Sequence, residues 1–188
     1  MKVKYLRTKG TWREITDSAR TTQGLKEGEG EPSSLWKKRI LLAEHSPIRK
    51  LIVDWKWYDL KYWVSVHFVR HKFGIEHWIK SQRPDRGLTD NRNNSPQSAL
   101  VNHECEANAQ AIINISRKRL CMKASPETRL AWTEFLYKLS EFELELYSAC
   151  VPDCIYRGHC YEMNSCGFYK TLPFQNWLKE YREGINDM

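Results

Sequence analysis

The strongest constraint on the fold is a short alternating run rich in tryptophan. In residues 51–57 an apolar side chain occupies every odd position, ending in Trp55 and Trp57, whereas Asp54 and Lys56 occupy even positions. A period of two places alternate side chains on opposite faces of a β-strand. The run therefore predicts a strand with one buried face. Because the aromatic residues share that face, we interpret them as core and not as a platform for stacking bases.

Apolar residues at helical spacing predict helices in the segments around this strand. One helix is expected to begin at Pro32-Ser33-Ser34 and to stop at Glu44-His45-Ser46-Pro47, since a residue before proline leaves helical geometry. Asp59 is expected to N-cap a second helix that ends near Arg70-His71. Further predictions are an edge strand at Val3–Leu6, a loop over 70–83, and helices over 102–121, 126–148 (core positions include Leu130 and Phe142) and 173–183. The pattern indicates an α+β fold, mostly helical with a small sheet.

Composition is typical of one globular domain. The chain has 188 residues, 41% of them hydrophobic, which suits a single core. Thirty basic and twenty-three acidic residues give a net charge of +7, which favours anionic partners. The start of the chain resembles no signal peptide, and no apolar run approaches the ~20 residues of a membrane span. We therefore expect a cytoplasmic protein without a membrane partner.

Directly after the second predicted helix, the chain becomes rich in hydrogen-bond donors. Unpaired buried charge is costly, so such a segment does not belong to the core. Its donors outnumber its acceptors, which favours an anionic ligand such as a nucleotide phosphate or the edge of a nucleobase. The donors are Arg70, His71, Lys72, His77, Lys80, Ser81 and Arg83.

A second polar cluster lies on the predicted helix that follows Asn108. Gln110, Asn114 and Lys118 are spaced by four, so they share one helix face. Two amides and a cation on one face form a hydrogen-bonding ridge. Taken alone, such a stripe is more typical of a solvent-facing helix.

Six cysteines leave two interpretations open. Cys105 and Cys121 lie in segments expected to be helical, where a buried thiol behaves as a small hydrophobic group. The others crowd the C-terminal region, but their spacing differs from the paired C-x2-C of a familiar zinc ribbon. A zinc site would use Cys154, Cys160 and Cys166, and free structural thiols are the alternative.

The order of these motifs resembles the flavin-dependent thymidylate synthases (ThyX). Their signature is R-H-R-x2-S-x-N-x2-S-x-R-Y, and this chain has Arg70-His71-Lys72 at its start and Ser81-x-Arg83 at its end, with one extra residue between them. His45-Ser46-Pro47 stands where the family has an upstream motif, and the segment 108–119 resembles its downstream helix. Arg92 and Pro96 resemble an R-x3-P stretch before that helix, so the likeness covers roughly residues 19–132.

The departures indicate a compact, divergent relative of the kind expected in phage genomes, so the resemblance implies the cytoplasm of a bacterium or of a phage-infected host cell. Lys72 replaces an arginine, which removes the planar bidentate fork and keeps the charge. Ile75 and His77 stand where the family has Ser and Asn, and Pro84 stands where it has Tyr. The connector that follows Arg83 is also shorter than in typical members.

The resemblance implies a small antiparallel sheet packed with long helices over residues 1–149, and a cysteine-containing extension over 150–188 packed on the same domain. It also implies transfer of a one-carbon unit from methylenetetrahydrofolate to dUMP, with FAD as cofactor and NADPH as reductant, giving dTMP. Family members supply binding and orientation while the flavin supplies the redox chemistry. The implied assembly is a homotetramer whose active sites lie between subunits.

By the same resemblance, two sets of residues are assigned to ligands. Fixed donors aimed at developing charge accelerate reactions, so Ser81, Arg83 and Arg119 are the expected catalytic positions. The expected flavin contacts are His45, Ser46, Arg70, His71, Lys72, Asn108, Gln110 and Asn114. The expected nucleotide contacts are His67, Ser81, Gln82, Arg83, Arg92 and Arg119.

Two other functions stay open. A related flavoenzyme would modify another pyrimidine nucleotide, for example by hydroxymethylation. A basic nucleic-acid-binding protein with a zinc-stapled C-terminus would also explain the positive charge, the eight tryptophans and the cysteines. Against this second function, the donors concentrate in two motifs and form no basic stripe, so nucleic acid is not the expected partner.

Overall fold

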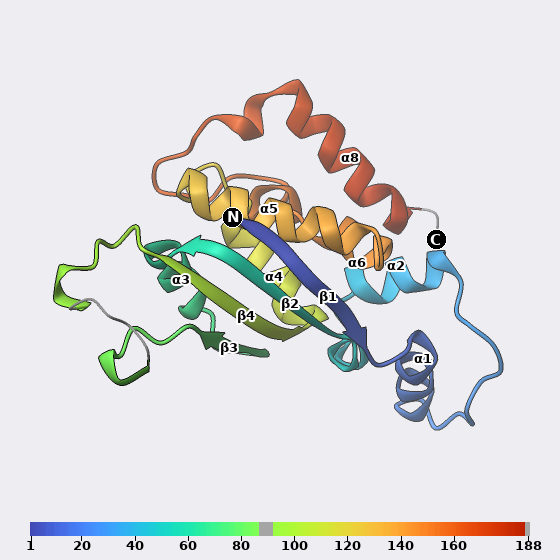
Figure 1. The fold of residues 1–188 in the computed structure, drawn as a ribbon. Helices are drawn as coiled ribbons and strands as arrows, with labels where there is room; N and C mark the ends of the chain where they lie inside the picture. Colours follow the sequence, from blue (N-terminus) through green and yellow to red (C-terminus); the bar gives the residue numbers. More distant parts are fainter. Residues whose placement is uncertain (87–91, 187–188) are drawn as a thin grey trace.

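The computed structural model describes residues 1–86 and 92–186, and it contains one four-stranded antiparallel sheet with helices packed on one face (Figure 1). The strand order is β1-β2-β4-β3, which leaves β1 and β3 at the edges. The predicted α+β class is therefore confirmed. The strands are β1 (Lys2–Lys9), β2 (Ile52–Lys61), β3 (Ile75–Ile79) and β4 (Leu100–Asn108).

Eight α-helices and four short 3₁₀ segments complete the described part of the chain. The α-helices are α1 (Trp12–Thr21), α2 (Ser34–Leu42), α3 (Tyr62–Val69), α4 (Ala109–Arg119), α5 (Pro126–Ser140), α6 (Leu144–Ala149), α7 (Asp153–Arg157) and α8 (Leu172–Asn186). The 3₁₀ segments are Ser46–Lys50, Pro84–Arg86, Arg92–Asn94 and Phe168–Lys170.

The tryptophan face of β2 forms the centre of the core, as the alternation predicted. Trp55 and Trp57 have no exposed surface. Trp55 stacks on Phe135 of α5 with 4.2 Å between ring centroids, and Trp57 stacks on Phe68 of α3 at 4.6 Å. The Trp57 indole N–H donates to the Ala131 carbonyl, so this buried polar group is satisfied.

The opposite face of the sheet is held by cross-strand ion pairs. Lys9 of β1 lies 2.5 Å from Glu106 of β4 and 3.0 Å from Asp54 of β2. Lys56 lies 2.5 Å from Glu104. Partly exposed pairs such as these contribute little free energy each, but opposite charges facing one another across the sheet favour this register over a slipped one.

Two predictions of secondary structure were wrong, one for the donor-rich segment and one for the segment that contains Asn108. The segment 70–83 is not a continuous loop, because it contains β3, whose Ile75, His77 and Ile79 alternate with outward residues. The predicted helix over 102–121 is a strand followed by a helix. In β4, alternate side chains from Val101 to Ala107 point inward and are buried, so the period is two until Asn108 caps α4.

Smaller corrections concern helix ends. Asp59 lies within β2 at a positive φ of 56°, and the residue before α3 is Lys61, so Asp59 is not the N-cap. The predicted helix 126–148 breaks after Ser140 into α5 and α6, and Leu130 and Phe142 are more than half exposed. Helix α1 was not predicted, although Thr11 and Glu14 form a capping box at its start.

The C-terminal segment packs on the same helical layer. Helix α8 lies against α2 and α7, and α7 lies against α4 (Figure 1). A small apolar cluster of Val151, Ile155 and Phe174 holds this segment together. Within the described residues, no helix is both long and apolar enough to cross a membrane. The division at residue 149 stays a prediction.

Candidate functional site

The end of α4 meets the end of α3 through Arg119. Its Nε donates to Nε2 of His71 at 2.9 Å, and its Nη2 donates to the His67 carbonyl at 2.5 Å. Burial first, and then the Arg119 charge, lowers the pKa of His71 to about 4. His71 is therefore neutral near pH 7, and because its Nε2 accepts from Arg119, its proton lies on Nδ1. The structure thus brings together Arg119, His71 and His67 from the predicted site.

This group, which we call the Arg119 cluster (His67, Arg70, His71 and Arg119), concentrates positive charge. Burial, followed by the charges of Arg119 and Arg70, lowers the pKa of His67. Burial and the Arg70 charge also lower the pKa of Arg119. Among the described residues, no carboxylate forms an ion pair with Arg70, Lys72 or Arg119. Uncompensated cations at a partly buried site favour an anionic ligand.

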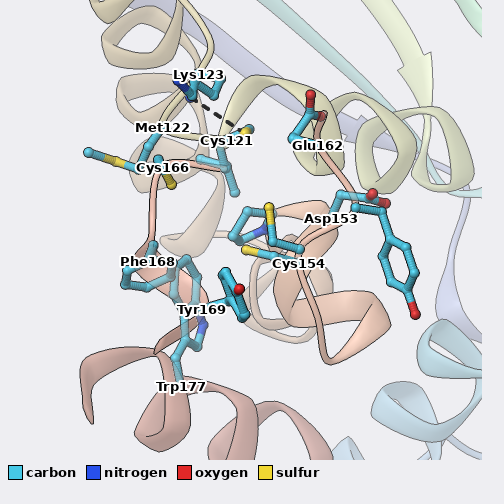
Figure 2. Close-up of a pocket in the computed structure, with 14 residues that line it drawn as sticks. Cys121, Met122, Lys123, Asp153, Cys154, Glu162, Cys166, Phe168, Tyr169 and Trp177 are labelled. Atoms are coloured by element: carbon cyan, nitrogen blue, oxygen red, sulfur yellow. Dashed lines mark hydrogen bonds between the residues drawn. The ribbon is translucent and has the colours of Figure 1, made fainter. Parts of the chain in front are cut away.

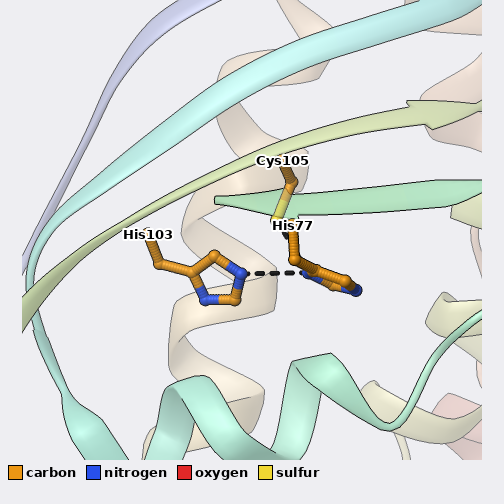
Figure 3. Close-up of side chains that lie close together, drawn as sticks. All are labelled: His77, His103 and Cys105. Carbon is orange, nitrogen blue, oxygen red and sulfur yellow. Dashed lines mark hydrogen bonds between the residues drawn. The ribbon is translucent and has the colours of Figure 1, made fainter. Parts of the chain in front are cut away.

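A pair of histidines supports the chain just after His71 (Figure 3). His77 Nε2 lies 3.0 Å from the His71 carbonyl oxygen, and this oxygen accepts, so His77 carries its proton on Nε2. Its Nδ1 is then an acceptor and lies 3.0 Å from Nε2 of His103, which donates. His103 is fully buried, and burial, then the charge of His77, lowers its pKa to about 3. His103 is therefore assigned as neutral.

Cys105 completes this group on the inner face of β3 and β4. Its Sγ lies 3.4 Å from His77 Nδ1. In the described part of the chain, His77, His103 and Cys105 are the three residues whose metal-ligating atoms all lie within 4.8 Å of one another. Two of those atoms are already hydrogen-bonded to each other, and burial raises the pKa of the Cys105 thiol well above its usual range. We therefore interpret the trio as a hydrogen-bonded core group that holds the turn after His71.

Asn108 links the start of β3 to the start of α4. Its Oδ1 accepts from the Ala111 N–H as the N-cap of α4, and its own N–H donates to the Gly74 carbonyl. Gly74 has a φ of +71°, and a Cβ on it would lie 2.6 Å from Asn108 Nδ2. The side-chain oxygen of Asn108, a predicted flavin contact, therefore already accepts a hydrogen bond as the N-cap of α4.

The other predicted flavin contacts gather around Glu44, away from the Arg119 cluster. Gln110 Nε2 donates to Glu44 Oε2 at 2.5 Å, and Arg117 forms an ion pair with the same carboxylate. Asn114 Oδ1 accepts from Arg117 at 3.1 Å. His45 and Ser46 follow Glu44 and are exposed. Sequence reasoning missed Glu44 and Arg117, although Arg117 is one position from the predicted polar face.

The predicted nucleotide residues Ser81, Gln82 and Arg83 line a cavity of about 520 Å³ after β3. Tyr62 and Lys80 line it as well; Lys80 was one of the donors expected from the sequence, whereas Tyr62 was not predicted as a site residue. Arg83 donates twice to Asp85, at 3.0 and 2.7 Å, and its N–H donates to the Ser81 hydroxyl. Arg92 begins the 3₁₀ segment Arg92–Asn94; its side chain lies outside the described residues.

Within one copy of the chain, the two parts lie at opposite ends of β3. The Arg119 cluster lies before β3, and the Ser81–Arg83 segment lies after it. At about 3.3 Å per residue, the first and last Cα atoms of β3 are about 13 Å apart. The predicted metal ligands lie elsewhere again, at a pocket of the C-terminal segment (Figure 2).

Comparison with known proteins identifies the architecture. No family model matches the chain, and no curated protein matches it significantly. Among solved structures, the chain is similar to the flavin-dependent thymidylate synthase ThyX from Helicobacter pylori complexed with FAD and dUMP, with a TM-score of 0.64 and 15% identity over 80% of this chain and 100% of that chain. A second structure of the same enzyme, also with FAD and dUMP, gives 0.63 at 16% identity over 80% and 99% of the two chains.

The third similar structure is a UMP/dUMP methylase, PolB from Streptomyces cacaoi, bound with 5-Br dUMP. It has a TM-score of 0.63 and 10% identity over 78% of this chain and 93% of that chain. The chain has the ThyX fold. Because the Helicobacter ThyX structure is covered completely by four fifths of this chain, this chain carries additional sequence beyond the shared ThyX fold.

Proposed function

We propose that this chain is a flavoenzyme that modifies the uracil ring of dUMP, and that the modification is methylation to dTMP. The supporting observation is the Arg119 cluster, which places unpaired cations and a neutral histidine at one end of a ThyX-like sheet. The proposed one-carbon donor is methylenetetrahydrofolate and the proposed reductant is NADPH. Each of these ligands is anionic, as is dUMP, which fits the net charge of +7.

The donors of the Arg119 cluster, together with the adjacent Lys72, fit FAD. Arg70 and Lys72 have no ion-pair partner within the described chain and are suited to a pyrophosphate. Phe73 follows them and is 92% exposed, which offers an apolar ring for a planar ligand. When bound, the flavin supplies the redox chemistry and the protein supplies orientation and electrostatics. Gln110, Asn114 and His45 belong to this proposal as more distant contacts beside Glu44.

His71 has a specific role in the proposal. Arg119 occupies its Nε2, so the Nδ1–H is fixed as a donor for a ligand oxygen or nitrogen. A neutral donor held in one tautomer needs no reorganisation when charge develops on the ligand. Arg119 also donates to the His67 carbonyl, so it contacts the last turn of α3 at His67 and the chain just beyond the helix at His71. Arg119 thus acts as a binding cation and as a positioning residue.

The nucleotide phosphate is proposed to bind Ser81, Gln82 and Arg83. Arg83 is paired with Asp85, and both side chains are more than half exposed. An exposed pair of this kind is worth about 0–1 kcal/mol, so a phosphate dianion can displace Asp85 at small cost. Lys80 and Tyr62 line the same cavity and add a further cation and a hydroxyl.

We propose that the complete site forms between copies of the chain, in a homotetramer. Within one copy the two halves of the site lie at opposite ends of β3, and the proposed ligand contacts Arg119 of one copy and Arg83 of another. The exposed rings of Phe73 and Trp78 lie at this edge strand, and an unpaired edge with exposed aromatic rings is suited to association.

Flavin binding tests the proposal. Purified protein is expected to be yellow, or to gain a flavin absorption band on titration with FAD, and then to turn over dUMP in the presence of methylenetetrahydrofolate and NADPH. Arg83→Ala should abolish turnover and leave FAD bound, whereas the matched control Arg86→Ala, outside the cavity lining, should keep both. A colourless protein that ignores FAD and binds single-stranded DNA with a steep salt dependence would reject the proposal.

A further inference from the structure

Four of the six cysteines line a single pocket between the main domain and the C-terminal segment (Figure 2). Cys121 comes from the turn after α4, Cys154 from α7, and Cys160 and Cys166 from the loop before α8. The cavity measures about 240 Å³. We propose that these four thiols bind one Zn²⁺ ion, and that the ion ties the C-terminal segment to the main domain.

The fold supports this proposal because the loop carrying Cys160 and Cys166 has little else to hold it. Residues 158–167 contain no helix or strand, and residues 159–166 make no backbone–backbone hydrogen bond to the rest of the described chain. Tyr161 and Met163 expose their apolar side chains to solvent. The nearby apolar cluster has only three buried members. A segment with so small a core is commonly stabilised by a metal or a disulfide, and every cysteine here is a free thiol.

Cys121, Cys154, Cys160 and Cys166 all line this one cavity. Because four thiols drawn from three separate segments converge on one cavity, the set matches the Cys₄ composition of structural zinc sites.

Binding requires the sulfurs to lie closer together than they do in the structure. No three of the four sulfurs lie within 4.8 Å of one another, whereas the edge of a zinc–thiolate tetrahedron is about 3.8 Å, given Zn–S bonds of about 2.3 Å. Gly158 and Gly167 flank the loop at φ angles of 75° and 81°, which glycine adopts without strain. The Lys123 N–H already points at Cys121 Sγ, at 3.5 Å, and such a donor supports a metal-bound thiolate.

The binding step conserves charge and protons. Four thiols release four protons as they form four Zn–S bonds, and no oxidant or reductant takes part. Soft thiolate ligands select zinc over magnesium or calcium. Cys105 and Cys150 are excluded from the set because both are buried in the main core and neither lines this cavity.

Metal analysis of the full-length protein tests the proposal. After purification and gel filtration, elemental analysis should find about one zinc per chain, and release of the metal by a mercurial thiol reagent should be complete. Replacement by Co²⁺ should give the intense visible absorption of a tetrahedral cobalt–thiolate centre. The double variant Cys160→Ser with Cys166→Ser should lose the zinc, while the matched control Cys150→Ala should keep it.

Several outcomes would overturn the proposal. They are wild-type protein without zinc, zinc that survives the double variant, iron in place of zinc, and disulfides between these cysteines in freshly purified protein. If the double variant fails to fold, the cobalt spectrum of the wild-type chain decides, because a centre without sulfur-to-cobalt charge-transfer bands would exclude the four thiols. None of these results depends on FAD or dUMP, so the zinc proposal and the proposed function succeed or fail separately.

Discussion

The two ends of β3 present the same kinds of residue in opposite states. Before the strand, Arg119 and His71 are partly buried and hydrogen-bonded to elements far apart in the sequence. After it, Arg83 is exposed and pairs with Asp85 two residues away. Long-range contacts fix the first group before any ligand arrives, whereas local contacts leave the second group free to change partner. In the proposed enzyme, the first end is therefore a prebuilt cofactor site, and the second becomes complete on assembly or nucleotide binding.

Removing Arg119 is expected to have the largest effect, and it tests whether the end of β3 near His71 is a preformed site. Arg119→Ala deletes two charge-assisted hydrogen bonds and releases both His71 and the His67 carbonyl. Charged hydrogen bonds are worth about 1.5–3 kcal/mol each, so we expect FAD affinity to fall roughly 100-fold and turnover to disappear. The measurement is fluorescence titration of FAD. Arg119→Lys, which keeps the charge but loses the fork, should fall between wild type and Arg119→Ala; an affinity equal to wild type in both variants would contradict the prebuilt site.

A second test strains the junction behind the cluster. Gly74→Ala places a methyl group 2.6 Å from Asn108 Nδ2 at a φ of +71°. Non-glycine residues at such angles cost about 1–3 kcal/mol, so thermal unfolding should begin several degrees lower and FAD binding should weaken. Gly24→Ala is the matched control, because Gly24 has a similar φ of +69° but no neighbour within 4 Å. Equal losses in the two variants would show that contact with Asn108 is irrelevant.

The buried histidines make stability depend on pH. The folded pKa values of His103 and His71 are about 3 and about 4, below the ordinary value of 6.5. Their stabilising contribution is therefore complete above pH 6.5 and is lost as the pH falls from 6.5 toward those values, because the unfolded chain binds protons that the folded chain does not. Unfolding temperatures measured from pH 7.5 to 4.5 should fall. His103→Gln should flatten this dependence, and an unchanged slope would refute the neutral assignment.

The smallest expected effect lies at the exposed end. Asp85→Ala removes the local partner of Arg83, and since the pair is worth at most about 1 kcal/mol, dUMP should bind only about two- to fivefold more tightly. The measurement is the KM for dUMP at saturating FAD. A weaker affinity would indicate that Asp85 positions Arg83 for the phosphate and does not compete with it.

Sequence periodicity predicted the centre of the molecule better than its polar strands. The aromatic alternation of β2 and the start of α2 at Ser33 were correct because apolar burial and a capping hydroxyl leave clear local signals. Strands β3 and β4 also alternate, but their inward positions include His77, His103 and Cys105. Histidine and cysteine are also common in ligand sites, so these positions did not stand out as buried. The alternation typical of a strand was therefore not recognised in β3 and β4.

The candidate site was predictable in part for a related reason. His67, His71 and Arg119 converge because α3 and α4 end at the same place, and it was the resemblance to ThyX that assigned these residues to the site. The pairing of Gln110 and Arg117 with Glu44 was not predictable, since it depends on Glu44 at a positive φ of 52° after α2. A contact between residues so far apart in the sequence cannot be inferred from the sequence pattern around either residue.

The central claim is that the two ends of β3 meet in one site through different copies of the chain. Arg119→Ala and Arg83→Ala chains, carrying different affinity tags, can be co-expressed and purified by both tags in succession, so that every assembly contains both variants. Each variant alone should be inactive with dUMP. The mixed assembly should recover on the order of a quarter of the wild-type turnover, because one class of interface then combines an intact Arg119 with an intact Arg83. Mixed assemblies that bind FAD yet remain as inactive as the single variants would contradict the account.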